Sequence, residues 1–130
     1  ENEINGKSFP LEAHFVHASK DGKLAVVAVM FEEGKENSVL KQIWSKMPQK
    51  VTESSCGLDS ANIKEILPAN KAYYRFSGSL TTPPCSEGVR WFVMQEYSHI
   101  SKSQVEKFAK IVHGHNNREV LELNARKVIK

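Results

Sequence analysis

The sequence is poor in cysteine and contains no long apolar run. Only two cysteines, Cys56 and Cys85, occur in 130 residues, and neither has a second cysteine or a histidine at the spacing of a zinc finger. The pair therefore allows one disulfide or two free thiols, and the redox compartment stays open. Because no stretch reaches the roughly 18 consecutive apolar residues of a transmembrane helix, we do not expect a membrane protein.

A block of charge of one sign is also missing. Lysine and arginine number 18 against 15 aspartates and glutamates, and the basic residues are scattered among the acidic ones. A nucleic-acid partner is therefore not expected. No repeat, linker or low-complexity stretch divides the chain, so a single domain is expected. The chain begins at Glu1, with neither a methionine nor a signal-like segment, and this beginning looks cut rather than encoded.

What the sequence does have is a regular alternation followed by a continuous apolar run. Residues 9–17 alternate with the period of a strand. The alternation places Glu12, His14 and Val16 on one face, and Leu11, Ala13, Phe15 and His17 on the other. Asp21 and Gly22 form a turn signal before residues 24–31, which are apolar and rich in β-branched side chains. The two segments are predicted to pair as a hairpin, buried on both faces and central in its sheet.

Later segments predict short helices between further strands. Residues 39–47 have a helical stripe that ends at Pro48, and residues 101–112 begin with Ser101 and Gln104 as a capping box. A shorter stripe runs from the candidate N-cap Asp59 to Pro68. Strands are predicted at residues 72–80 and 89–97, and a last extended segment at 118–130. The predicted fold class is mainly β (α+β), with a twisted, predominantly antiparallel sheet and a few short surface helices.

Two stretches could carry chemistry. Glu12 and His14 lie about 7 Å apart on one face of a strand, an arrangement that suits a metal-ligating histidine oriented by a carboxylate. The alternative is a core histidine that Glu12 merely satisfies. The loop in "SGSLTTPPCSEGVRW", residues 77–91, presents adjacent threonine hydroxyls beside two stiffening prolines. Its alternative is a plain structural turn.

These two stretches, with "NNRE" and "LNAR" near the end, resemble the α-class carbonic anhydrases of the bacterial secreted type. The resemblance covers nearly the whole chain but only the C-terminal half of the family's domain, so residues 1–130 are expected to be the C-terminal part of one such domain. It implies reversible hydration of CO2 to bicarbonate and a proton, with Zn²⁺ as cofactor, in the complete protein. The alternative is an inactive carbonic-anhydrase-like fragment or a binding or structural protein.

The resemblance also implies roles for particular residues. His14 looks like the third zinc ligand, and Glu12 like the carboxylate that orients it. Thr81 resembles the gatekeeper that accepts a hydrogen bond from the attacking hydroxide and donates one to Glu1, with Thr82 beside the substrate. The apolar wall for CO2 is expected at Val16, Val26, Leu80, Val89 and Trp91. An apolar wall suits CO2 because this molecule has no net dipole and few hydrogen-bonding options.

The first two zinc ligands of the family lie upstream of Glu1, so the 130-residue chain alone is expected to be inactive. Its expected partners are the missing N-terminal half and, through unpaired strand edges, a second copy in a homodimer. Cys85 matches a cysteine that pairs with one in the missing half, and a Cys56–Cys85 bond stays open. His113 and His115 are not expected to replace the missing ligands. At residues 118–123 "REVLEL" departs from the family's pattern. The bacterial members are usually exported, which suggests a periplasmic or secreted protein.

Overall fold

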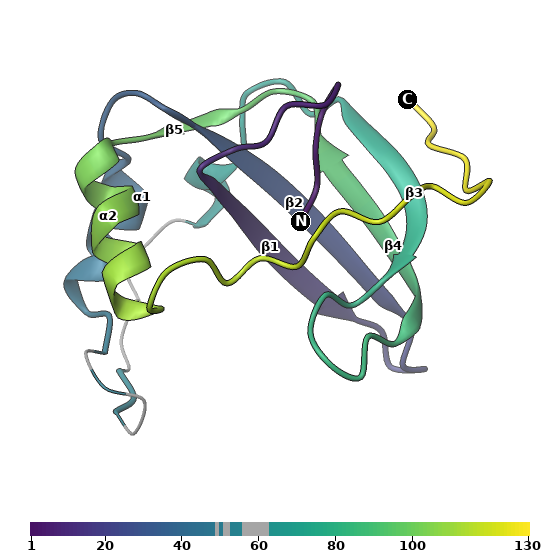
Figure 1. The fold of residues 1–130 in the computed structure, drawn as a ribbon, viewed down its shortest axis with the longest axis horizontal. Helices are drawn as coiled ribbons and strands as arrows, with labels where there is room; N and C mark the ends of the chain where they lie inside the picture. Colours follow the sequence, from purple (N-terminus) through teal and green to yellow (C-terminus); the bar gives the residue numbers. More distant parts are fainter. Residues whose placement is uncertain (49, 51–52, 56–62) are drawn as a thin grey trace.

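A mixed β-sheet forms the centre of the molecule (Figure 1). The computed structural model describes residues 1–48, 50, 53–55 and 63–130. Strand β1 (Leu11–Ala18) pairs antiparallel with β2 (Leu24–Glu33), and β3 (Tyr73–Ser79) pairs antiparallel with β4 (Glu87–Met94). These two hairpins supply the longest pairings. The predicted mainly β fold with a few short helices is confirmed.

One parallel pairing joins the two hairpins into one sheet, and a second adds a short strand. Strand β2 runs parallel to β4 and to the short β5 (Ser98–Ile100), which gives the order β1–β2–β4–β3 with β5 beside β2. A parallel neighbour requires a long connection, and the chain between β2 and β4 provides it. The hairpin of residues 9–31 was predicted to be central. In the described part of the chain β2 is central, whereas β1 has β2 as its only neighbour and forms an edge.

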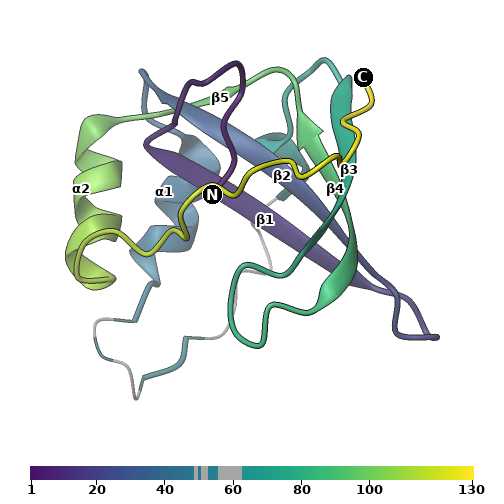
Figure 2. The same cartoon turned by 45° about the vertical axis from the view of Figure 1, so that its right-hand side comes forward.

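Two helices cover one face of this sheet (Figures 1 and 2). Helix α2 (Lys102–Ile111) lies within its predicted segment, and helix α1 (Ser38–Ser45) overlaps its own but begins one residue before it. Within the predicted stripe at residues 59–67, the described residues form the 3₁₀ turn η1 (Ile63–Ile66), and the expected N-cap Asp59 lies outside the described residues. Phe31, Trp44 and Ile100 belong to the core between helices and sheet, and Leu11, Ala13 and Phe15 of β1 pack against it. No helix in the described ranges is long and apolar enough to cross a membrane.

The buried side chain of Gln104 ties the starts of the two helices together. Its amide oxygen accepts from the backbone N–H of Asn37 at 2.9 Å and of Ser101 at 3.2 Å, and its Nε2 donates to the Asn37 carbonyl at 2.9 Å. Asn37 is the N-cap of α1, and Ser101 is the N-cap of α2 in a complete capping box. The predicted capping box is therefore confirmed, and it also serves the other helix.

Replacing Gln104 with leucine is expected to lower the free energy of unfolding by about 2 kcal/mol. The leucine fills the space but leaves the Asn37 backbone N–H without its acceptor, whereas the Asn37 carbonyl keeps its bond from the Lys41 N–H. An unsatisfied polar group near the core costs this much. Urea unfolding followed by circular dichroism measures the change. Gln42→Leu, on the exposed side of α1, is the matched control and should change stability by less than about 0.5 kcal/mol. Equal losses would show that Gln104 does not join the helices.

Candidate functional site

The sheet face away from the helices carries the predicted site residues. Strand register pairs Glu12 with Met30 and His14 with Ala28, and both β2 residues are fully buried in a second apolar cluster with Val26, Val89 and Trp91. Side chains of paired residues share a face of a sheet. Glu12 and His14 therefore lie on the same face, as the alternation predicted, beside an apolar surface.

The imidazole of His14 is held on two sides. Its Nε2 lies 2.8 Å from Oε1 of Glu12, and its ring meets the Trp91 indole edge-to-face, with ring centroids 4.9 Å apart and planes at 84°. Edge-to-face contacts of this kind favour one relative orientation of the two rings. The remaining nitrogen, Nδ1, lies 3.5 Å from Oε2 of Glu1. A neutral His14 that donates from Nε2 carries its lone pair on Nδ1.

The carboxylate of Glu12 is itself well satisfied. Burial raises its pKa, but hydrogen bonds from His14 and Asn2 lower the pKa further than burial raises it, so the net pKa lies below the usual value for glutamate. Asn2 donates from its backbone N–H at 3.0 Å and from its side-chain amide at 2.6 Å. Glu12 is thus an ionised acceptor at neutral pH, which fixes the proton of His14 on Nε2.

The threonine loop connects β3 to β4 and lies beside the same face. Its base is closed by a hydrogen bond from Leu80 N to the Ser86 carbonyl at 2.9 Å, and within it Cys85 N donates to the Thr82 carbonyl at 2.9 Å. Cys85 is a free thiol, whereas Cys56 lies outside the described residues. The disulfide of Cys85 with a cysteine of the N-terminal half stays a prediction.

The residues predicted to form the apolar wall are arranged across three strands. Val16 pairs with Val26, and Val26 with Trp91, so they form one row across β1, β2 and β4. Val26, Val89 and Trp91 are buried and Leu80 packs against them, but Val16 is 58% exposed at the edge strand. Trp91 is locked in place because its Nε1 donates to the Ser79 carbonyl at 3.0 Å and its ring stacks on Phe76.

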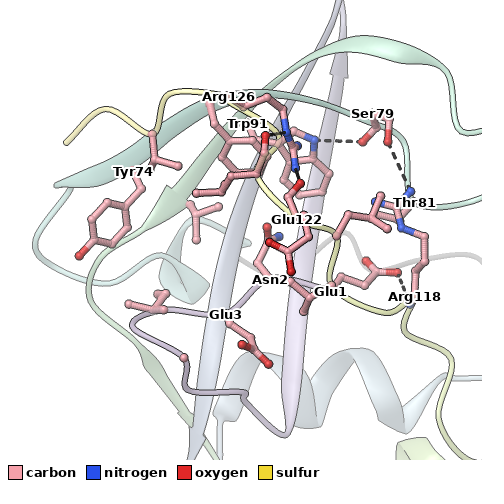
Figure 3. Close-up of a pocket in the computed structure, with 18 of the residues that line it drawn as sticks. Glu1, Asn2, Glu3, Tyr74, Ser79, Thr81, Trp91, Arg118, Glu122 and Arg126 are labelled. Carbon is pink, nitrogen blue, oxygen red and sulfur yellow. Dashed lines mark hydrogen bonds between the residues drawn. The ribbon is translucent and has the colours of Figure 1, made fainter.

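Two cavities flank these residues. The first, about 720 Å³, lies between the sheet and the C-terminal segment, and Trp91 and Phe76 line it (Figure 3). The second, about 820 Å³, is lined by Glu12, His14 and Thr82, among others. The residues that border both cavities are Glu1, Asn2, Glu3, Thr81, Arg118 and Val120. Thr81 and Glu1 thus line the same space, although the carboxylate of Glu1 accepts a hydrogen bond from the backbone N–H of Arg118, at 3.2 Å. The hydrogen bond from Thr81 to Glu1 stays a prediction.

The metal donors do not form a complete set within the described residues. In this part of the chain no three histidine, cysteine, aspartate or glutamate side chains gather as a metal ion would need. His113 and His115 follow α2, and both are exposed; His115 borders the second cavity, and His113 adopts a left-handed backbone conformation. His14 supplies one imidazole whose orientation fits a metal ligand, because a carboxylate holds its other nitrogen.

Comparison with known proteins identifies the family. A family model described as eukaryotic-type carbonic anhydrase matches residues 1–130. The chain belongs to this family. It is 46% identical over 129 residues to a carbonic anhydrase of Pectobacterium carotovorum, covering 99% of this chain and 53% of that protein. A carbonic anhydrase of Neisseria gonorrhoeae is 48% identical over 130 residues, again covering 99% of this chain and 51% of the relative.

The solved structures agree in fold. The α-carbonic anhydrase of Photobacterium profundum superposes with a TM-score of 0.94 at 49% identity, and the match covers 100% of this chain and 59% of that one. The chain therefore spans about half the length of the carbonic anhydrases it matches. This fraction agrees with a chain that holds only part of the family's domain.

Two residues at this candidate site were not predicted from the sequence. Asn2 holds Glu12, and Arg118 contacts both Glu1 and the segment that precedes Thr81. Arg118 lies in "NNRE", which was recognised as a family motif without a role. The signal that could have indicated a role for Arg118 is that it is an arginine within a motif otherwise typical of a polar loop. No signal in the sequence singled out Asn2.

Proposed function

We propose that the complete protein containing these residues catalyses the reversible hydration of CO2 to bicarbonate and a proton at a zinc ion. The observation that carries the proposal is His14, whose Nε2 is engaged by an ionised Glu12 while Nδ1 faces Glu1 beside a cavity. Family membership and the identity to named carbonic anhydrases support it. Because the chain spans half of those relatives, the activity is proposed for the complete protein only.

His14 would hold zinc through Nδ1, with Glu12 fixing its tautomer and the direction of its ring. A catalytic zinc site uses three protein ligands and one open position, so two further ligands have to come from outside the described residues. When bound, zinc supplies a hydroxide nucleophile near neutral pH by lowering the pKa of a coordinated water, a property established for carbonic anhydrases. Trp91 would restrict the rotation of the His14 ring through its edge-to-face contact.

The other residues would orient the reactants. Thr81 would accept a hydrogen bond from the attacking hydroxide while its own hydroxyl donates a hydrogen bond to the carboxylate of Glu1, which turns the hydroxide lone pair toward CO2. Thr82 would contact the substrate. The row of Val16, Val26 and Trp91, with Leu80 and Val89, would hold CO2 by its apolar surface. A preorganised site of this kind lowers the barrier because no group has to reorient during the reaction.

The partner that completes the site is the N-terminal half of the domain. The half-length match to the relatives supports this assignment, as does the edge strand β1, whose outward backbone groups have no neighbour in the described chain. The competing possibility is that a second copy of the chain pairs with the edge strand β1 and forms a homodimer. Export to the periplasm or the medium is part of the same proposal and rests on the resemblance to exported bacterial members.

Zinc binding and catalysis are tested on two proteins. The 130-residue chain alone should bind zinc weakly in equilibrium dialysis and show no CO2 hydration in a stopped-flow assay. The same chain joined to the N-terminal half of the P. carotovorum relative should bind one zinc ion per chain and hydrate CO2. Sedimentation of the two proteins separates completion by the other half from homodimer formation.

Two outcomes would contradict the proposal. Tight, stoichiometric zinc on the 130-residue chain would mean that its remaining histidines form a site. A joined protein that folds and binds zinc but does not hydrate CO2 would favour a binding or structural protein.

A further inference from the structure

The side chain of Arg118 lies between two parts of the site that are distant in the sequence. Its Nη1 is 3.4 Å from Oγ of Ser79 and 3.4 Å from the carbonyl oxygen of Leu80, the residue directly before Thr81. Its backbone N–H donates to Oε1 of Glu1 at 3.2 Å. Figure 3 shows the bonds of Arg118 to Glu1 and Ser79 beside the first cavity. One residue therefore contacts both members of the proposed Thr81–Glu1 pair or their immediate neighbours.

The segment that carries Arg118 has no regular secondary structure to fix it. After α2 the chain continues beside the N-terminus, as both views of the fold show (Figures 1 and 2). Its only bridge to the sheet in the described residues joins Ile129 to Arg75. The guanidinium of Arg118 is half-buried, and its contacts through Nη1 anchor this segment on the site. Its Nε is buried without a hydrogen-bond partner among the described residues.

We propose that Arg118 is a positioning residue that sets the separation between Glu1 and Thr81. The proposal rests on the function proposed above and goes beyond it, because it assigns a role to the motif "NNRE". The backbone N–H of Arg118 donates to Oε1 of Glu1, so that the other oxygen, Oε2, faces Nδ1 of His14. The guanidinium holds the Leu80 carbonyl, and through it the backbone that presents Thr81. Hydrogen bonds from a charged donor in a poorly solvated site are strong enough to fix such a geometry.

The test replaces the side chain of Arg118 in the joined protein. Arg118→Met keeps the backbone N–H and the length of the side chain but loses the donor to Ser79 and Leu80. We expect kcat for CO2 hydration to fall about 100-fold, the effect of a small misplacement of reacting groups, while KM and zinc affinity change less than about 2-fold. Arg118→Lys should recover most of kcat, because the single atom Nη1 makes both contacts and an ammonium group offers donors for both.

Arg126→Met is the matched control. Arg126 lies in the same segment and lines the first cavity, but its guanidinium donates to the carbonyls of Glu122 and Leu123. This variant should keep kcat. If Arg118→Met keeps kcat as well, or loses zinc affinity together with kcat, Arg118 does not position the Thr81–Glu1 pair and the proposal is wrong.

A second readout does not depend on catalysis. In the 130-residue chain, Arg118→Met should speed hydrogen exchange about 10-fold at two hydrogen-bonded backbone amides, those of Arg118 and Leu80, without a change at the amides of β2. Exchange that is unchanged at both positions would show that Arg118 is not a positioning residue, even if the joined protein were inactive. Failure of the proposed function, in contrast, would abolish activity in the unmodified joined protein and leave the exchange result intact.

Discussion

Replacing His14 with alanine in the joined protein is expected to remove both zinc binding and CO2 hydration. A site with three protein ligands cannot keep its metal when one imidazole is lost, and the described residues contain no cluster of metal-binding side chains that could replace it. Zinc content after dialysis and stopped-flow hydration measure the two losses. The fold should survive, because the His14 side chain is partly exposed on an edge strand.

His17→Ala is the control for this variant, since His17 lies on the same strand but points away from the site and is exposed. It should keep full zinc content and activity. Glu12→Gln provides an intermediate case, because a glutamine can still contact Nε2 but no longer carries charge. Loss of such a supporting carboxylate should weaken zinc affinity roughly 10- to 100-fold. A His14→Ala protein that still held zinc would contradict the assignment of His14 as a ligand.

Thr81→Ala in the joined protein is expected to slow CO2 hydration roughly 100- to 1,000-fold with zinc still bound. Removing one preorganised hydrogen bond at a reacting oxygen costs about 2.7 to 4 kcal/mol in the barrier. The variant should fold normally, because the loop is held by backbone bonds of Leu80 and Cys85 that do not use the threonine hydroxyl. Stopped-flow hydration at matched zinc occupancy gives the rate.

Thr82→Ala is the neighbouring comparison and should cost less, because Thr82 is proposed to touch the substrate without orienting the hydroxide. The structure places Thr82 on the second cavity only, whereas Thr81 borders both. If Thr82→Ala loses activity and Thr81→Ala keeps it, the two roles are exchanged. If neither variant changes the rate, the loop is a structural turn and the mechanism fails.

The strands and the face that carries Glu12 and His14 were predictable because they depend on local periodicity. Alternation fixes which side chains of β1 share a face, whatever the strand pairs with, and the Asp21–Gly22 turn fixes its partner. The parallel pairing of β2 with β4 was not predictable, since it depends on how two hairpins far apart in the sequence meet. The position of β1 at an edge follows from the same long-range arrangement.

The site was predictable only where a family motif marks it. The alternation and the resemblance pointed to His14 and its carboxylate, but the contact of His14 with Trp91 requires the register of β1, β2 and β4 together. Arg118 reaches Glu1 across the whole fold, and no local pattern encodes that contact. Val16 matched the apolar wall by position, yet it is exposed because β1 is an edge strand in the described residues.

The bond between Arg118 and Glu1 has a consequence for the order in which the molecule forms. It joins residues 117 positions apart, and closing a loop of that length in an unfolded chain costs about 4 kcal/mol of configurational entropy, apart from a constant. One hydrogen bond contributes less than this. The two ends therefore meet only after the sheet between them has formed and brought them close. The Arg118–Glu1 contact is therefore a late product of folding, and a peptide that holds only one of its two residues cannot form it.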